Sequence, residues 1–243
     1  MKLYGLQKMT LLDFPGHVAC TVFLGGCDFR CPFCHNFELA DGKAAPVMEE
    51  DEFFSFLAKR KGLLDGVAVT GGEPCLHKGL PAFLERVRGM GFGTKLDTNG
   101  HHPELLREIL DRGLADYVAM DIKNSPEKYD ETCGTERTGK ETADIIYPVH
   151  MDRVRESIAL IIGNAPDYEF RTTVVDELHE ASDFEEIGKM IAGAKQYFLQ
   201  SFTDRDTVPF EGFHAPDPEL LEKYAEIVRK YVAHVEVRGV QGE

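Results

Sequence analysis

Short apolar, β-prone runs alternate with amphipathic segments along most of the chain. The clearest apolar run covers residues 17–24 and ends at Gly25-Gly26, which is typical of a strand buried on both faces. Further strands are expected at residues 66–70, 93–97, 116–122, 168–175 and 196–202, with a short last strand at 235–237. Helical patterns cover residues 49–63, 80–90, 103–111, 153–162, 184–194 and 217–232. Residues 2–9 are short and mixed and predict no element.

This alternation predicts the fold class. Six strand-then-helix units in succession favour a parallel sheet with right-handed crossovers. Six units are fewer than the eight of a closed TIM barrel. We therefore predict an α/β fold with an open, partial (β/α)6 barrel, and we expect a single domain over residues 1–243 because no repeat, low-complexity tract or linker divides the chain.

Composition and charge narrow the possible functions. The hydrophobic fraction of 43% and the charged fraction of 28% are ordinary for a globular protein. A net charge of −15 argues against a general nucleic-acid or anionic-membrane surface, which needs clustered Lys and Arg. No apolar run approaches the roughly 20 residues that span a bilayer, and the N-terminus lacks the apolar region of a signal peptide. We expect a cytosolic protein with no nucleic-acid or membrane partner.

Three cysteines lie close together directly after the first buried strand. Cys27, Cys31 and Cys34 fall within eight residues, and three thiols at this spacing can hold three of the four irons of a [4Fe-4S] cluster. The fourth iron would then stay open to a substrate or cofactor. Zinc is the alternative metal and would need a fourth ligand such as His35. Cys20, Cys75 and Cys133 have no partner at ligand spacing, so a second cluster is not expected.

The three-cysteine motif, with Phe33 between its last two thiols, resembles the radical S-adenosylmethionine (radical SAM) signature. This resemblance implies that Cys27, Cys31 and Cys34 bind the cluster, and that the open iron binds the amino and carboxylate groups of SAM. It also implies that Phe33 lies near the adenine, and that reductive cleavage of SAM gives a 5′-deoxyadenosyl radical. The continuation His35-Asn36 is similar to the glycyl-radical-enzyme activases.

A glycine-rich motif follows the second predicted strand, at Thr70-Gly71-Gly72-Glu73-Pro74. Glycines allow the backbone to approach a ligand closely, although a tight strand-to-helix turn would explain the same residues. The motif resembles the GGE motif of radical SAM proteins. That resemblance implies that Gly71, Gly72 and Glu73 contact the amino group of SAM.

Asp97 and Asp121 end the third and fourth predicted strands. Neighbouring carboxylates need a cation, a Lys or a proton between them. Similar motifs in the pyruvate formate-lyase activase branch imply that Asp97, Thr98 and Asp121 bind a monovalent cation, together with the carbonyl of Ala119, and that Lys123 faces SAM. The alternative makes Asp97 a helix N-cap and Asp121 an ion-pair partner of Lys123.

Arg171 lies inside a β-branched run on the fifth predicted strand. Burying an Arg there is costly unless an anion meets it. The family resemblance implies contact with the SAM carboxylate, and an ion pair with Glu169 is the alternative. On the sixth strand, Gln200 stands where the pyruvate formate-lyase activases have a His, so the sequence departs from that branch.

The resemblance spans nearly the whole chain, and residues 8–36 are most similar to anaerobic ribonucleoside-triphosphate reductase activating proteins. It implies an activase that forms a glycyl radical on a partner enzyme, with a flavodoxin- or ferredoxin-type reductant. One alternative is a radical SAM enzyme acting on a small molecule or peptide, such as a deazapurine synthase. Another is a non-catalytic iron-sulfur protein. Several polar residues receive no role from the sequence: His35, Asn36, His101, His102 and His214.

Overall fold

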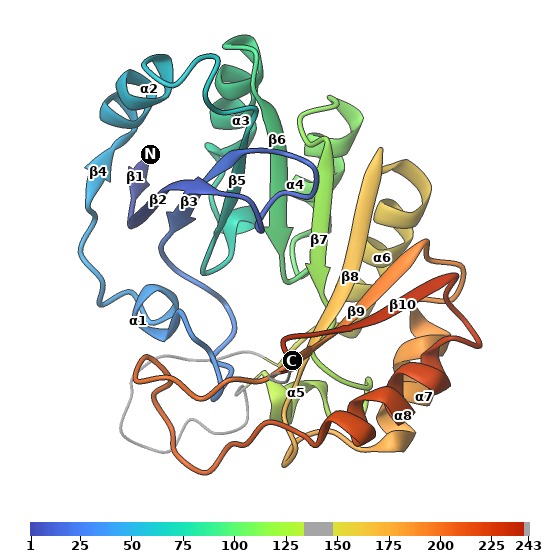
Figure 1. Cartoon of the computed structure of the whole chain (residues 1–243). Helices are drawn as coiled ribbons and strands as arrows, with labels where there is room; N and C mark the ends of the chain where they lie inside the picture. Colours follow the sequence, from blue (N-terminus) through green and yellow to red (C-terminus); the bar gives the residue numbers. More distant parts are fainter. Residues whose placement is uncertain (134–147, 241–243) are drawn as a thin grey trace.

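The computed structural model describes residues 1–133 and 148–240. In these residues, eight strands form one curved sheet in the order β10-β9-β8-β7-β6-β5-β3-β2 (Figure 1). Their bounds are β2 Gly5–Thr10, β3 Ala19–Leu24, β5 Gly66–Gly71, β6 Gly93–Thr98, β7 Tyr117–Asp121, β8 Asp167–Val174, β9 Gln196–Ser201 and β10 His234–Arg238. The predicted strands are therefore confirmed, including the short last one.

Every neighbouring pair from β3 to β10 is parallel, and only β2 pairs antiparallel, with β3. The two edge strands β2 and β10 do not pair with each other, so the sheet stays open. This confirms the expected partial barrel. The sheet gains β10 as a seventh parallel strand and β2 as an antiparallel edge.

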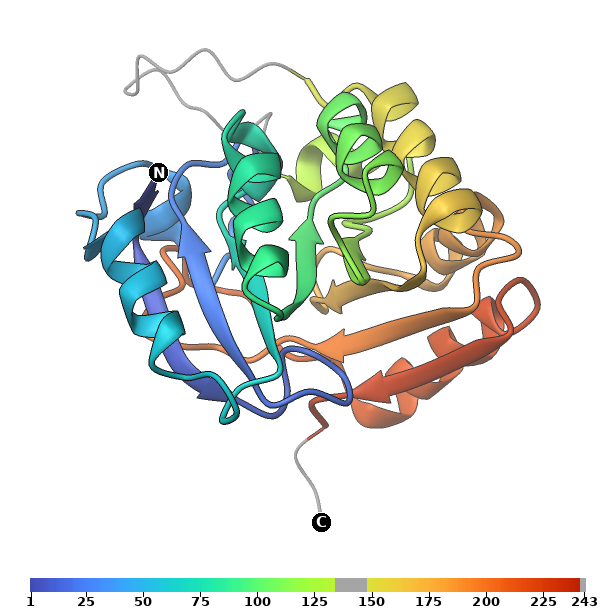
Figure 2. The same ribbon diagram turned by 90° about the horizontal axis from the view of Figure 1, so that it is seen from above.

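Helices follow the strands and cover the sheet from one side (Figure 2). Their bounds are α2 Glu50–Ala58, α3 Leu80–Gly89, α4 Pro103–Asp111, α6 Met151–Asn164, α7 Ala181–Met190 and α8 Pro218–Val228. Helix α2 begins with a reciprocal capping box between Glu49 and Glu52. It ends earlier than predicted, because the chain turns after Ala58 and reaches Gly62 with a φ of 79°.

The N-terminal strands were missed by the sequence pattern. Strand β1 (Lys2–Leu3) pairs with β4 (Met48–Glu49) in a separate two-stranded sheet, and β2 covers the outer edge of β3. Most side chains of β2 are partly or fully exposed. An edge strand of this kind has no buried face over most of its length, so its sequence lacks the alternation that identifies a strand.

The carboxyl ends of the parallel strands meet at one end of the sheet. Short helices α1 (Phe37–Ala40) and α5 (Tyr129–Thr132) lie at this end, together with the segment that follows β9 (Figure 1). Ligand sites of parallel α/β folds form at this edge. The fold therefore gathers the loops after β3, β5, β6, β7 and β8 around one region.

Candidate active site

A pocket opens at the carboxyl ends of the parallel strands and encloses ≈ 840 Å³ including its open mouth. Of the residues predicted for the site, the lining includes Cys27, Cys31, Phe33, Cys34, Gly71, Gly72, Asp97, Thr98, Asp121, Lys123 and Arg171. Glu73 and Gln200 are not part of the lining.

The cysteine loop is fixed mainly by backbone contacts. The Gly26 N–H donates to the Leu39 carbonyl at 2.7 Å, and the Arg30 N–H donates to the Cys133 carbonyl at 2.8 Å. The Phe29 N–H points at the Cys27 sulfur, with an N–S distance of 3.3 Å. The loop thus holds its thiols toward the pocket through the main chain of both neighbouring segments.

The spacing of the three thiols bears on the choice of metal. Among the described residues, no group of three or more His, Cys, Asp or Glu that contains these cysteines has its ligand atoms within 4.8 Å of one another. Sulfurs bound to a single tetrahedral zinc would lie about 3.8 Å apart, whereas each thiol of a cubane binds its own iron. His35, the fourth zinc ligand considered, donates from Nε2 to the Thr203 carbonyl at 2.6 Å and stacks on Phe202. The arrangement favours an iron-sulfur cluster over zinc.

The glycine turn lies against the start of the cysteine loop. The Gly72 N–H donates to the Leu24 carbonyl at 2.9 Å, and the Glu73 N–H donates to the Gly26 carbonyl at 2.8 Å. A Cβ on Gly72 would meet the Gly26 oxygen at 2.0 Å, and one on Gly71 would meet the Leu24 oxygen at 2.2 Å. Only glycine permits this backbone contact, which places Gly71 and Gly72 at the pocket wall.

The Glu73 side chain is turned away from the pocket into the protein. Its carboxylate accepts hydrogen bonds from the Cys75 N–H at 2.8 Å, the Thr98 hydroxyl at 2.8 Å and the Asn99 N–H at 2.6 Å. Burial raises the pKa of Glu73 to about 7, against the effect of these donors. Glu73 therefore ties the glycine turn to the loop after β6.

A row of alternating charges forms the floor of the pocket. Arg171 Nε donates to Asp121 Oδ1 at 2.5 Å and its Nη2 donates to Asp97 Oδ2 at 3.1 Å. Lys123 Nζ lies 2.8 Å from Asp121 Oδ2, and Lys95 Nζ donates to Asp97 Oδ1. The ion pair that the sequence offered as an alternative for Asp121 is thus present, whereas the N-cap of helix α4 is His102 and not Asp97.

These contacts fix the charge states of the row. Burial would raise the pKa values of Asp97 and Asp121, but the neighbouring cations, Arg171 first, hold both below the usual value. Burial would likewise lower the pKa of Lys123, yet Asp121 and the Cys31 thiol raise it. Asp97, Asp121 and Lys123 are therefore ionised near pH 7.

The row does not fit the predicted separate monovalent cation. The guanidinium of Arg171 already bridges the two carboxylates, and the Thr98 hydroxyl donates to Glu73 instead of joining them. Glu169 approaches Arg171 only at 3.8 Å, while its other oxygen accepts from the Tyr117 hydroxyl at 3.0 Å.

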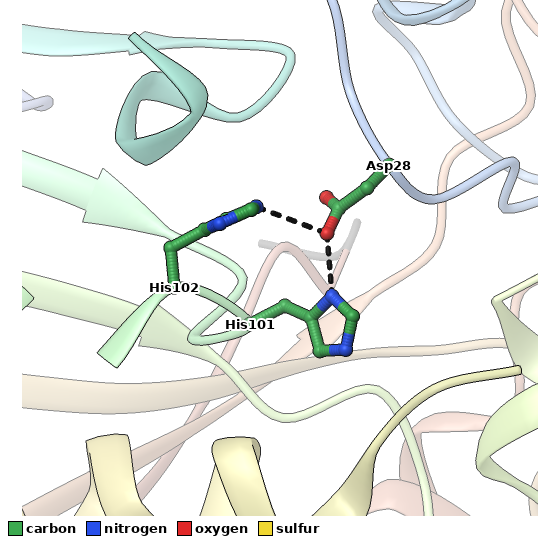
Figure 3. A group of neighbouring side chains, drawn as sticks. All are labelled: Asp28, His101 and His102. Atoms are coloured by element: carbon green, nitrogen blue, oxygen red, sulfur yellow. Dashed lines mark hydrogen bonds and ion pairs between the residues drawn. The ribbon is translucent and has the colours of Figure 1, made fainter. Parts of the chain in front are cut away.

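Four polar residues near Cys27 form a network that the sequence did not reveal. Asp28 Oδ1 accepts from Asn99 Nδ2 at 2.8 Å, while its Oδ2 lies 2.5 Å from His101 Nδ1 and 3.1 Å from His102 Nε2 (Figure 3). Burial opposes ionisation, but these three hydrogen bonds lower the pKa of Asp28. The only signal was the position of Asp28 directly after the first cysteine. Its partners lie more than seventy residues away in the chain.

Both ring nitrogens of His101 take part in this network. The His150 N–H donates to His101 Nε2 at 3.2 Å, so the ring proton lies on Nδ1, the atom that faces Asp28. The network joins the cysteine loop to the loop after β6.

The segment after β9 closes one side of the site. Besides the contact of Thr203 with His35, Phe210 packs edge-on against Phe37, with ring centroids 5.9 Å apart. His214 Nδ1 lies 2.5 Å from Glu177 Oε1. The segment therefore bridges the loop after β8 and the region that follows the cysteine motif.

Comparison with known proteins agrees with this geometry. Residues 21–150 match the model of the family described as "Radical SAM superfamily". A Methanocaldococcus jannaschii protein named "Putative glycyl-radical enzyme activating enzyme MJ1227" is 31% identical over 98% of this chain and 96% of its own.

The chain belongs to the radical SAM superfamily.

Further relatives place this radical SAM enzyme among proteins named as activating enzymes. The pyruvate formate-lyase-activating enzyme of Listeria monocytogenes is 27% identical over 90% of this chain and 92% of its own. The 7-carboxy-7-deazaguanine synthase of Thermococcus kodakarensis is 31% identical, but over only 45% of this chain and 51% of its own. It is a radical SAM enzyme similar to glycyl-radical-enzyme activating enzymes.

Solved structures confirm the radical SAM fold. The chain matches a radical SAM methyltransferase from Sphaerobacter thermophilus with a TM-score of 0.69 and 15% identity, over 96% of this chain and 69% of that one. It matches Streptococcus suis SuiB bound to S-adenosylmethionine with a TM-score of 0.66 and 14% identity, over 91% and 52%.

The superfamily implies a [4Fe-4S] cluster and SAM, and the residues of the pocket are suited to both. The three thiols face one cavity but do not converge on a single ion. The backbone of Gly71 and Gly72 and the charged residues of the floor face the same cavity.

Within residues 1–133 and 148–240, no helix is long and apolar enough to cross a membrane.

The glycine turn gives a first test. Gly72→Ala should lower the melting temperature and impair SAM binding, because its Cβ would force apart two backbones at a cost of about 1–3 kcal/mol. Gly163→Ala, at a helical position with nothing within 4 Å of the added atom, should be neutral or stabilising. Equal melting temperatures for both variants would contradict the proposed contact.

Buried Glu73 gives a pH test on the metal-free protein. Its pKa is raised in the folded state to about 7. The protonated side chain therefore stabilises the folded protein fully below the pKa that Glu73 has in the unfolded chain, and this stabilisation is lost as the pH rises through about 7. Between pH 5 and 8 the unfolding free energy of the wild type should fall by about 2 kcal/mol more than that of Glu73→Gln. Denaturant titrations at both pH values measure this difference, and parallel pH profiles would refute it.

Proposed function

We propose that this enzyme is an activase that forms a glycyl radical on a partner enzyme. The observation that carries the proposal is the end-to-end similarity to a protein named as a glycyl-radical enzyme activating enzyme, at 31% identity over 98% of the chain. The similarity to a deazaguanine synthase stops at 45% of the chain. The match that supports the activase therefore includes the carboxyl-terminal strands as well as the cysteine loop.

In this proposal Cys27, Cys31 and Cys34 hold the [4Fe-4S] cluster and leave one iron for SAM. When bound, the cluster and SAM supply a reducing electron and a 5′-deoxyadenosyl radical that abstracts a hydrogen atom. The Phe29 N–H donates to the Cys27 sulfur at 3.3 Å and favours its thiolate, whereas burial and the carboxylates of Asp28 and Glu73 raise the pKa of Cys27 in the protein without the cluster.

The other residues of the site have backbone or side-chain groups that are suited to the separate parts of SAM. Backbone at Gly71 and Gly72 suits the amino group, with Glu73 acting through the turn that it stabilises. Arg171 and Lys123 offer N–H groups to the carboxylate of SAM. Phe33, which is buried and packs edge-on near Phe202, provides an apolar surface for the adenine.

The proposed partner is an anaerobic ribonucleotide reductase, and the electron would come from a flavodoxin- or ferredoxin-type protein. A glycine Cα in a partner loop must reach the pocket, and the barrel is not closed, since the edge strands β2 and β10 do not pair with each other. The net charge of −15 suits a partner that presents basic residues around such a loop.

A radical SAM enzyme acting on a small molecule is the second candidate. The partial match to 7-carboxy-7-deazaguanine synthase supports it, since it covers 130 residues at 31% identity. Both candidate functions use the same pocket for the cluster and SAM. They differ in the substrate, which is a protein loop in the first and a small molecule in the second.

The cluster can be tested by anaerobic reconstitution of the wild type and two cysteine variants. Cys31→Ala should lose iron and should form no 5′-deoxyadenosine from SAM and dithionite, because one iron loses its ligand. Cys20→Ala should behave as the wild type, because Cys20 is buried in strand β3 away from the pocket. Product from Cys31→Ala, or none from the wild type, would contradict the proposal.

The activase function can be tested with a candidate anaerobic ribonucleotide reductase. Reduced enzyme and SAM should generate a glycyl radical on the partner, visible by electron paramagnetic resonance (EPR). A partner with its radical glycine changed to alanine should give no signal. Formation of 5′-deoxyadenosine with a small-molecule substrate, and without a radical on any glycyl radical partner, would support the second candidate instead.

A further inference from the structure

The carboxylates of Asp97 and Asp121 have every oxygen occupied by a cationic side chain. Asp97 Oδ1 pairs with Lys95 and Asp97 Oδ2 with Arg171 Nη2. Asp121 Oδ1 pairs with Arg171 Nε and Asp121 Oδ2 with Lys123. Each of the four carboxylate oxygens therefore has a cationic partner, although both side chains also line the pocket.

The register of three neighbouring strands creates this arrangement. Arg171 on β8 lies directly opposite Asp121 on β7, and Asp97 on β6 lies opposite Ala119, two residues before Asp121 on the same face. The guanidinium therefore reaches across β7 and bridges both carboxylates. Its fork of N–H groups can donate to two carboxylates at once, which the single ammonium group of a Lys does less well.

The row already holds more cations than carboxylates. Three cations, Lys95, Lys123 and Arg171, face the two carboxylates. Glu169 is the nearest further anion, and its Oε2 is shared between the Tyr117 hydroxyl at 3.0 Å and Arg238 at 3.3 Å. A sodium or potassium ion at this place would meet a net positive surrounding, which costs free energy in a mostly buried site.

We propose that Arg171 is the built-in cation of this pocket and takes the place of the monovalent metal ion that the family resemblance implied. Arg171 is thereby a positioning residue that keeps Asp97 and Asp121 ionised and in place, independently of sodium or potassium. A guanidinium has five N–H groups, so those not bound to the carboxylates remain for an anionic ligand. This last role rests on the proposed function, in which the ligand is SAM.

The wild-type apoprotein provides the first arm of the test. Its melting temperature is measured in sodium, potassium and N-methylglucamine chlorides at equal ionic strength. We expect the three values to agree within about 1 °C, since no site binds the metal. A saturable stabilisation by sodium or potassium would overturn the proposal.

The second arm removes the guanidinium charge. Arg171→Met leaves Asp97 Oδ2 and Asp121 Oδ1 without donors, and hard monovalent ions bind such oxygens. The variant should be less stable than the wild type in N-methylglucamine and should regain about 5 °C when sodium or potassium saturates the new site. An Arg171→Met protein that is indifferent to the cation would refute the proposal.

Two further variants serve as controls. Arg238→Met removes an Arg on strand β10, two strands from β8, that contacts Glu169 and stacks on Phe198; it should gain no cation dependence. The double variant Asp97→Asn/Arg171→Met removes one carboxylate and should lose most of the sodium effect. The wild-type comparison decides the question alone if Arg171→Met does not fold.

These measurements are made without cluster or SAM, so they are separable from the proposed function. An enzyme that forms no 5′-deoxyadenosine but is insensitive to sodium and potassium would fail only the proposed function. A normal SAM reaction that requires sodium or potassium would fail only the inference about Arg171.

Discussion

The pocket depends on the close approach of two backbones, those of the cysteine loop and the glycine turn. Gly71 and Gly72 come so near to Leu24 and Gly26 that a Cβ on either glycine would lie 2.0–2.2 Å from a carbonyl oxygen. Two main-chain hydrogen bonds hold the segments in this position. The place of the three thiols relative to the rest of the pocket follows from this contact, which only residues without side chains allow.

A second set of contacts closes a circuit around the thiols. Glu73 joins the glycine turn to the loop after β6 through Thr98 and Asn99, and Asn99 returns to the cysteine loop through Asp28. Each link uses a buried or partly buried polar group whose partner satisfies it. Such a circuit resists deformation, which is valuable where a cluster and a cofactor must stay in register.

The charged residues of the pocket floor lie outside this circuit. The parallel register of β6, β7 and β8 brings like and unlike charges into one row at the pocket floor. Each carboxylate has two cationic partners and Arg171 is common to both, so the row is a unit. Its excess of positive charge makes the floor receptive to an anionic group, whereas the surface of the protein as a whole is acidic.

The sequence by itself determined the order of the parallel strands and of the longer helices, the open barrel and many of the pocket residues. Apolar runs report burial on both faces, and motifs at strand ends share one edge of a parallel sheet. Only the tertiary structure decided which group neutralises Asp97 and Asp121, where the Glu73 carboxylate points, and that Asp28 meets His101 and His102. Those contacts join residues 25 to 74 positions apart, and side-chain direction at such distances follows from packing and register, which no local pattern encodes.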